Sequence, residues 1–224
     1  THFGGPVRIL HTSDLHLTPQ RLVELLTVLE GQDFDMWLDT GDFLPSLGRK
    51  AGDRVDPEAE VTHQRQFASL KRLAARFAER LDGRPLVSIP GNHCYVKMAD
   101  VIEGVHEVTP DGIEVAGVRI AGFRNVPYIA DEWVGETQSQ DLRQVVERVL
   151  ASGATIMANH APVAGILDET GNSYQYGVPQ LSTSLFYQPH GFTHIFHGHA
   201  HVSGGQTMTE AGMKFINGAG HARI

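Results

Sequence analysis

The apolar residues of the chain follow two patterns. Short apolar runs without a helical period predict buried β-strands, and they cover 7–10, 34–38, 86–89, 118–123, 155–158, 193–196 and 215–216. Segments with apolar residues three and four positions apart predict helices with one buried face, and they cover 18–31, 57–81, 138–150 and 180–186. Strands and helices therefore alternate in the N-terminal part of the chain and are mixed with further strands later.

Residues at the helix boundaries support this division. Thr18 followed by Pro19 is typical of a capped first turn, and Gly31 is typical of a helix end. The apolar face of the segment 57–81 is expected to join the core, and it consists of Phe67, Leu70, Leu73, Ala74 and Phe77.

The order of the elements indicates the fold class. It reads βαβαβ, then a β-rich stretch, then further helices and strands, which favours an α/β fold with mixed sheets. Pro110-Asp111-Gly112 predicts a turn between 105–108 and 113–115. The chain has no internal repeat and no linker, so its 224 residues are expected to form a single domain, 1–224.

Composition narrows the classes of partner. The chain has 18 Lys and Arg against 26 Asp and Glu, so its formal net charge is −8. This balance gives no electrostatic help in holding a polyanion and disfavours nucleic acid as a partner. The single cysteine, Cys94, excludes an intramolecular disulfide and suits a reducing compartment. We find no apolar run of about 18 residues and no signal-peptide pattern, so we expect a cytoplasmic protein without a membrane partner.

Polar residues follow five of the predicted strands directly. The five polar words are Ser13-Asp14-Leu15-His16, Thr40-Gly41-Asp42, Gly91-Asn92-His93, Asn159-His160-Ala161-Pro162 and Gly198-His199-Ala200-His201. Ligands of open α/β sheets sit beyond the carboxyl ends of the strands. Five such words in one chain therefore indicate a shared functional site better than they indicate five solvated loops.

The side chains in these words are metal ligands by type. They are two carboxylates, one amide and four imidazoles, from Asp14, Asp42, Asn92, His16, His160, His199 and His201. The set is too rich in oxygen for a thiolate zinc site and too rich in nitrogen for calcium or magnesium alone, so it suits Mn²⁺, Fe or Zn²⁺. Seven ligands exceed what one tetrahedral ion takes, which suggests two ions. The histidines outside these words, among them His11 and His197, are expected to have surface or structural roles.

The ordered set D-x-H, G-D, G-N-H, H-x-P and G-H-x-H resembles the calcineurin-like metallophosphoesterases. The resemblance implies a four-layer α/β/β/α sandwich with two divalent or transition metal ions. Mn²⁺ is the expected metal, and Fe and Zn²⁺ are the alternatives. It implies that one ion is held by Asp14, His16, Asp42 and His201. It implies that the other ion is held by Asp42, Asn92, His160 and His199, with Asp42 as the bridge.

The same resemblance implies an activity and one catalytic residue. The reaction would be hydrolysis of a small phosphorylated substrate, a phosphomonoester or phosphodiester, by a metal-bridging hydroxide that attacks phosphorus with the help of His93. The family usually has an acidic residue after G-N-H, where this chain has Cys94. If that acid orients the histidine, its loss weakens His93 as a proton donor. We expect Cys94 to fill space, as buried cysteines often do, ahead of acting as a nucleophile.

Two further pairs of residues are candidates for the substrate. Arg124 and Asn125 follow the predicted strand 118–123, and an arginine there suits a phosphate oxygen; a solvated loop explains them equally well. Tyr174 and Tyr176 lie in a segment where they could stack on a base or cover the cleft, and ordinary packing explains them equally well.

Two alternative functions remain beside the phosphoesterase. The start ILHTSDLHL also resembles repair nucleases with this fold, although the net acidity and the lack of an added DNA-binding region weigh against a nuclease. A non-catalytic metal-binding scaffold would usually have lost ligands, and none of the seven is lost here. The sequence leaves the natural substrate, the metals and the oligomeric state open.

Overall fold

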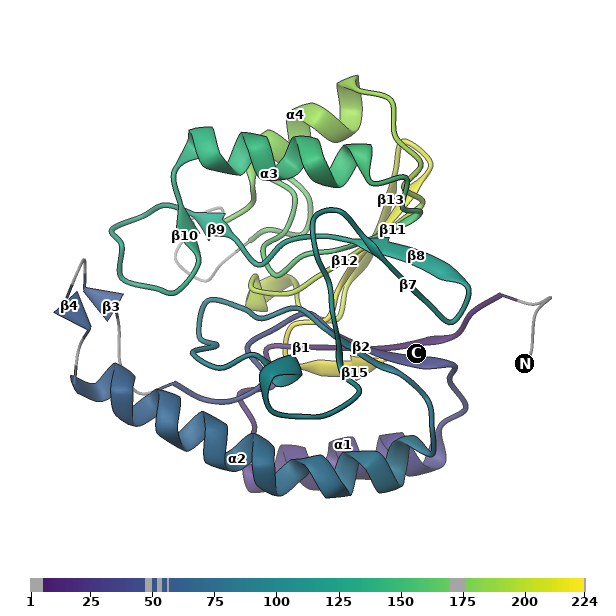
Figure 1. The fold of residues 1–224 in the computed structure, drawn as a ribbon. Helices are drawn as coiled ribbons and strands as arrows, with labels where there is room; N and C mark the ends of the chain where they lie inside the picture. The colour runs from purple at the N-terminus through teal and green to yellow at the C-terminus, as the bar shows by residue number, and fades with distance from the viewer. Residues whose placement is uncertain (1–5, 47–49, 52–53, 56, 170–175, 224) are drawn as a thin grey trace.

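The computed structural model describes residues 6–46, 50–51, 54–55, 57–169 and 176–223, and it has an α/β fold with two larger mixed sheets (Figure 1). The first sheet has the order β15 (His221–Arg223), β1 (Ile9–Ser13), β2 (Met36–Asp39), β5 (Leu86–Ser88) and β6 (His106–Glu107). The second has the order β13 (Thr207–Glu210), β14 (Met213–Asn217), β12 (His194–His197), β11 (Ile156–Ala158), β8 (Val118–Ala121) and β7 (Ile113–Val115). In both sheets parallel inner strands are flanked by an antiparallel edge.

The remaining elements connect and cover these sheets. The α-helices are α1 (Pro19–Gly31), α2 (Pro57–Leu81), α3 (Ser139–Ala151) and α4 (Pro179–Tyr187). The short elements are β3 (Lys50–Ala51), β4 (Arg54–Val55), β9 (Val126–Pro127), β10 (Glu136–Thr137) and the 3-10 helices η1 (Met98–Asp100) and η2 (His201–Ser203). β3 pairs with β4, and β9 pairs with β10.

Three separate cores divide the molecule into layers. The first core lies between α1, α2 and the first sheet and contains Leu10 and Trp37. The second lies between the two sheets and contains Leu38 and Phe196, and the third lies between the second sheet and α3 and α4 and contains Phe215. Successive strand residues point to opposite faces, so each sheet supplies two cores. Figure 1 shows the resulting order of helices, sheet, sheet and helices, the α/β/β/α arrangement that the sequence resemblance implies.

The boundaries of α1 agree with those predicted from the sequence, but one residue predicted to be buried in α2 is exposed. Thr18 Oγ1 accepts a hydrogen bond from the Arg21 backbone N–H at 3.2 Å, which caps α1, and the helix ends at Gly31. The prediction that Phe67 joins the core is wrong, because its side chain is 39 % exposed. Gln66 is buried in its place, because its amide group hydrogen-bonds to loop backbone and is satisfied there.

The apolar pattern does not indicate the full length of β1 or the presence of β13. β1 runs to Ser13, three residues past the predicted end, because β15 pairs with its second half. β13 was not predicted, since all four of its residues are exposed and show no apolar alternation. The predicted turn at 110–112 is present, and it takes the chain from β6 in the first sheet to β7 in the second.

Among the described residues, none of the helices combines the length and the apolar character needed to span a membrane.

Candidate metal centre

The polar words follow parallel strands in both sheets. Asp14 directly follows β1, Asp42 lies three residues after β2, and Asn92 lies four residues after β5. His160 and His199 each lie two residues after their strands, β11 and β12, in the second sheet. The two groups of loops meet, since the His199 backbone N–H donates to Asp14 Oδ2 at 2.7 Å. The site is therefore built across both sheets at the carboxyl ends of their strands.

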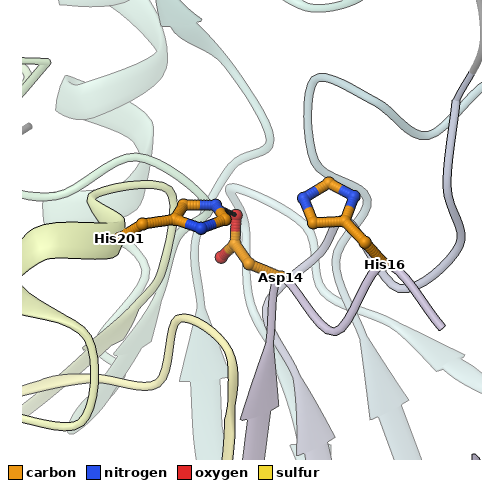
Figure 2. Close-up of side chains that lie close together, drawn as sticks. All are labelled: Asp14, His16 and His201. Atoms are coloured by element: carbon orange, nitrogen blue, oxygen red, sulfur yellow. Dashed lines mark hydrogen bonds and ion pairs between the residues drawn. The ribbon is translucent and has the colours of Figure 1, made fainter. Parts of the chain in front are cut away.

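Asp14, His16 and His201 form the first cluster, shown in Figure 2. A ligand atom from each lies within 4.8 Å of the others. His201 Nε2 lies 3.1 Å from Asp14 Oδ1, and the rings of His16 and His201 are stacked with centroids 5.7 Å apart. Asp14 is buried and His201 is exposed, so this cluster opens toward solvent.

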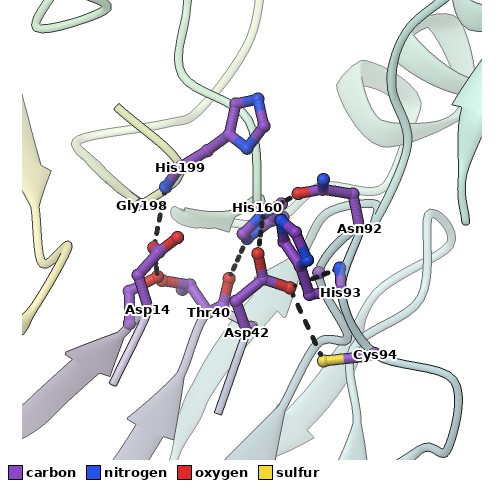
Figure 3. Close-up of polar contacts among 12 residues, drawn as sticks. Asp14, Thr40, Asp42, Asn92, His93, Cys94, His160, Gly198 and His199 are labelled. Carbon is purple, nitrogen blue, oxygen red and sulfur yellow. Dashed lines mark hydrogen bonds and ion pairs between the residues drawn. The ribbon is translucent and has the colours of Figure 1, made fainter. Parts of the chain in front are cut away.

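Asp14, Asp42 and His160 form the second cluster, which is fully buried. His160 Nε2 lies 3.3 Å from Asp42 Oδ2 and 2.8 Å from Asn92 Oδ1. The other ring nitrogen, Nδ1, lies 2.9 Å from the Thr40 carbonyl, which fixes the ring so that Nε2 faces the carboxylates (Figure 3). The ring of His199 stands edge-on to that of His160 at 4.9 Å, so all seven predicted ligands lie in one region.

The two clusters share a carboxylate. Asp14 belongs to both, whereas Asp42 belongs to the second. Burial lowers the pKa of the His16 ring, and the charges of Asp42 and Asp14 both oppose that effect. The assignment of Asp42 as the bridging ligand, which the resemblance implies, stays a prediction.

Four of the predicted ligands have a left-handed backbone, which is uncommon for residues other than glycine. Their φ angles are 50° for Asp14, 39° for His16, 52° for Asp42 and 65° for His199. Such conformations cost about 1–3 kcal/mol each and cluster at functional sites. The surrounding hydrogen bonds hold two of them in place, since Asp14 N–H donates to the Gly41 carbonyl at 2.8 Å and His16 N–H donates to the Asp42 carbonyl at 3.0 Å.

The glycines in two of the words allow the backbone to approach the carboxylates. A Cβ atom at Gly91 would overlap the Asp42 carboxylate, and one at Gly198 would overlap Ser13 Oγ and the Asp14 carboxylate. These residues are therefore glycine because any side chain would displace a candidate ligand.

The buried charges are balanced by neighbouring imidazoles. Burial raises the pKa of the Asp14 carboxyl, but the hydrogen bond from His201 together with the charges of His160 and His201 outweighs it, and the pKa falls to about 2. Burial also raises the pKa of Asp42, which the charge of His160 brings well below its usual range. Burial lowers the pKa of His160, but the charge and hydrogen bond of Asp42, with the Asp14 charge and the Thr40 carbonyl, outweigh this effect and raise it to about 9. Bound cations would take over this neutralisation and release protons.

The residues present fit divalent transition cations. Among the described residues, Asp42 Oδ2 is a buried oxygen without a hydrogen-bond partner, although His160 lies beside it. Burial lowers the pKa of His199 to about 3, so this ring is neutral and has a lone pair to donate. Carboxylates combined with neutral imidazoles and an amide oxygen suit Mn²⁺, Fe or Zn²⁺.

The family model of the calcineurin-like phosphoesterases matches residues 7–203. The chain belongs to the calcineurin-like phosphoesterase family. The matched segment contains all five polar words, from Asp14 to His201, so family membership and the geometry concern the same residues. No curated protein matches the chain.

Solved structures share the fold of this chain at low sequence identity. One has a TM-score of 0.70 at 14% identity and covers 95% of this chain and 90% of its own. TT1561 of Thermus thermophilus has a TM-score of 0.59 at 13% identity, with coverages of 95% and 89%. A dimetal phosphatase from Danio rerio has a TM-score of 0.53 at 12% identity, with coverages of 95% and 87%. At these identities the similarity shows the fold alone.

His93, the expected catalytic histidine, is held by contacts from several segments. Its backbone N–H donates to Asp42 Oδ1 at 2.7 Å, and its carbonyl accepts from Gln66 Nε2 at 2.8 Å. Ring Nδ1 lies 2.5 Å from Ser46 Oγ. Sequence reasoning missed Ser46 and Gln66, because one lies in an irregular loop and the other occupies an apolar face of α2. Ser46 gives the ring the polar partner that Cys94 does not provide.

Cys94 lies directly under the Asp42 carboxylate. Its Sγ donates a weak hydrogen bond to Asp42 Oδ1 at 3.8 Å, and its side chain is buried. Burial raises the pKa of the thiol to about 12, and the Asp42 charge adds to the effect. A protonated, buried thiol is a poor nucleophile, which supports the expectation of a space-filling residue.

The two residues proposed for the substrate are hydrogen-bonded within the protein. Arg124 Nη2 donates to the carbonyls of Gly91 and Cys94, each at 3.1 Å. Asn125 Nδ2 donates to Thr137 Oγ1 at 2.7 Å. Arg124 therefore supports the loop that carries His93, and its assignment with Asn125 to the substrate stays a prediction.

The remaining candidates are two tyrosines and two histidines outside the predicted ligand set. Tyr174 lies outside the described residues, whereas the ring of Tyr176 lies 5.3 Å from that of His199. His11 and His197 are buried, as expected of structural histidines, and each has one ring nitrogen without a partner among the described residues.

Proposed function

We propose that this chain is a hydrolase of phosphomonoesters or phosphodiesters that depends on two metal ions. The observation that carries the proposal is the meeting of two fully buried carboxylates with an amide and four imidazoles at the edge shared by both sheets. Burying two carboxylates together has a large desolvation free energy unless positive charge lies beside them. Family membership supports the same reaction class.

The proposed ligands divide into two groups. Asp14, His16, Asp42 and His201 would hold one ion, and Asp42, Asn92, His160 and His199 would hold the other. Mn²⁺ is the first choice, with Fe or Zn²⁺ as alternatives. The bound ions would offset the negative charge of the phosphoester and turn water into a nucleophile at neutral pH.

His93 would act as the proton donor to the leaving oxygen. Its Nδ1 is engaged by Ser46, which leaves Nε2 as the nitrogen for proton exchange. The hydrogen bonds of its backbone to Asp42 and Gln66 tie the ring position to the carboxylate that would hold both ions. The catalytic ring and the proposed metals would therefore keep a fixed relative position.

The proposal includes the setting in which the protein acts. We place the whole chain, 1–224, in one domain that acts on a small phosphorylated molecule in the cytoplasm. The net charge of −8 disfavours a polyanionic substrate, and a lone buried cysteine suits a reducing compartment.

Turnover of p-nitrophenyl phosphate and bis(p-nitrophenyl) phosphate tests the proposal. We expect chelator-treated protein to be inactive and Mn²⁺ to restore hydrolysis of at least one ester. His93→Ala should lower kcat by about 10²-fold or more with its metal content unchanged, because a general acid contributes that much. Asp42→Asn should lose bound metal, and His106→Ala, exposed on β6, is the matched control.

Three outcomes would contradict the proposal. Loss of metal from His93→Ala would move His93 into the ligand set. Cleavage of single-stranded or duplex DNA without turnover of either small ester would favour a nuclease. Two bound metals without turnover of any ester would favour a scaffold.

A further inference from the structure

The loop between β9 and β10 is organised by one carboxylate. Glu136 accepts hydrogen bonds from five consecutive backbone N–H groups, those of residues 129–133, at 2.8–3.0 Å. Burial raises the pKa of Glu136, but these hydrogen bonds outweigh it and lower the pKa. These five charge-assisted hydrogen bonds tie the backbone of residues 129–133 to the Glu136 carboxylate.

The base of this loop is joined to the candidate site. Gly135 has a φ of 85°, and a Cβ there would come within 3.4 Å of Arg124 Nε. Arg124 in turn holds the backbone of Gly91 and Cys94, the residues that flank Asn92 and His93. The loop and the catalytic segment therefore pack on the same arginine.

The loop places an indole on the expected catalytic histidine. The ring centroids of Trp133 and His93 lie 4.3 Å apart at 53°, and Trp133 is only half-buried. A second aromatic side chain, Tyr176, lies beside His199, with ring centroids 5.3 Å apart. Two of the residues at the candidate site, His93 and His199, therefore each have an aromatic neighbour.

The same loop exposes further apolar surface. Tyr128 is 45 % exposed and Ile129 is 56 % exposed, although both are large apolar residues. Five amide hydrogen bonds to Glu136 order this loop, and its apolar side chains still lie near solvent. Loops of this kind commonly line ligand-binding sites. Because His93 would protonate the leaving oxygen, the alcohol of a bound phosphoester would lie beside His93 and therefore near Trp133.

We propose that Trp133 is a stacking platform for a flat aromatic group on the alcohol side of the phosphoester. This inference rests on the proposed function and names its substrate class. The chemistry shared by the candidates is a planar ring, either a nucleobase or an aryl alcohol. Esters of aromatic alcohols are therefore better substrates than esters of small polar alcohols such as glycerol.

A binding measurement tests the platform without hydrolysis. Phenylphosphonate and methylphosphonate both present a phosphoryl group and have no ester to cleave. For Mn²⁺-loaded protein, titration calorimetry should show phenylphosphonate binding about tenfold more tightly, the range expected for one stacked ring. Trp133→Ala should reduce this ratio to within about threefold, and Trp133→Phe should restore most of it. Equal affinities in the wild-type protein would overturn the inference.

Kinetics separate stacking from support of His93. The loss of kcat/KM caused by Trp133→Ala should be about tenfold greater for phenyl phosphate or adenosine 5′-monophosphate than for glycerol 2-phosphate. The larger of the two aromatic losses identifies an aryl group or a nucleobase. Equal losses on all three esters would mean that Trp133 only positions His93, and would overturn the platform.

The loop itself is tested at Glu136. Glu136→Gln removes one of the two accepting oxygens, so it should lower the preference for phenylphosphonate as Trp133→Ala does. Glu147→Gln, exposed on α3, is the matched control and should keep the preference. A preference in binding without turnover of any ester would refute the proposed function and keep the platform. Turnover without the preference would refute the platform alone.

Discussion

At the scale of single residues, the catalytic histidine depends on groups that no motif contains. His93 has a hydroxyl partner at Nδ1 in Ser46, where an acid after G-N-H was expected to supply orientation. A hydroxyl can orient the ring and select its tautomer without adding a buried charge.

We predict that Ser46→Ala lowers kcat about tenfold, as losses of residues that orient a ligand or catalytic ring commonly do. The pH profile of kcat should shift as well, because the ring loses the partner that sets its tautomer. Ser46→Thr should recover most of the rate, and Ser69→Ala on α2 is the control. An unchanged pH profile in Ser46→Ala would assign Ser46 a purely structural role.

At the scale of elements, α2 shows how a helix face is divided between packing and support of the site. Phe77 is fully buried against Trp37 and Phe43, whereas Phe67 is exposed with the Lys71 ammonium 5.3 Å above its ring. Gln66 takes the core-facing position because its amide links α2 to the His93 loop.

We predict that Phe77→Ala lowers the free energy of unfolding by about 3–5 kcal/mol, the usual cost of a large core cavity. Phe67→Ala should lower it by no more than about 1 kcal/mol, since it removes only an exposed cation–π contact and some packing. Urea denaturation of both variants measures the difference. A similar loss of unfolding free energy in both variants would contradict the prediction and indicate that Phe67 contributes to the core as Phe77 does.

The pairing of β1 with β2 encloses a chain of buried hydrogen bonds. Trp37 Nε1 donates to Thr12 Oγ1, and Thr12 Oγ1 donates to Asp39 Oδ1, each at 2.8 Å. Asp39 also accepts from the Gly41 N–H at 3.2 Å. Burial raises the pKa of Asp39 to about 8, because these hydrogen bonds do not replace the water it has lost.

The raised pKa of Asp39 determines whether the stability of the fold rises or falls with pH. The folded state holds the Asp39 proton up to about pH 8 and the unfolded state loses it near 3.8, so stability falls as the pH rises between these values. We predict that Asp39→Asn flattens this fall in the metal-free protein, because the group no longer titrates. Urea titrations at several pH values measure the slope, and parallel slopes in the two proteins would contradict the prediction.

At the scale of the whole molecule, the candidate centre joins the two sheets. Asp14, Asp42 and Asn92 follow strands of the first sheet, and His160 and His199 follow strands of the second. Bound ions would therefore connect layers that otherwise meet through the apolar core between the sheets.

We predict that Mn²⁺ raises the unfolding temperature of chelator-treated protein. At a concentration 100 times the dissociation constant, one bound ion stabilises the native state by about 2.7 kcal/mol. Asp42→Asn should lose most of the shift and His106→Ala should keep it, as calorimetric scans would show. An equal shift in Asp42→Asn would indicate binding elsewhere.

Much of this organisation follows from the sequence. The apolar runs, the N-cap residue Thr18 and the helix end at Gly31 determined the α/β class and most helices, because burial of one face is a local pattern. The residue types in the five polar words determined the candidate ligands, because metal preference depends on donor atoms. The expectation of a single domain stays a prediction.

Only the tertiary structure decided what surrounds these ligands. The edge strand β15 pairs with β1 at the other end of the chain, and the exposed edge strand β13 forms a hairpin with β14; neither has an apolar signal of its own. The contacts of Ser46 and Trp133 with His93 join residues about forty positions apart or more, through loops whose path no local pattern records. The donors of the centre were therefore readable from the chain, whereas the groups that orient them depend on long-range packing.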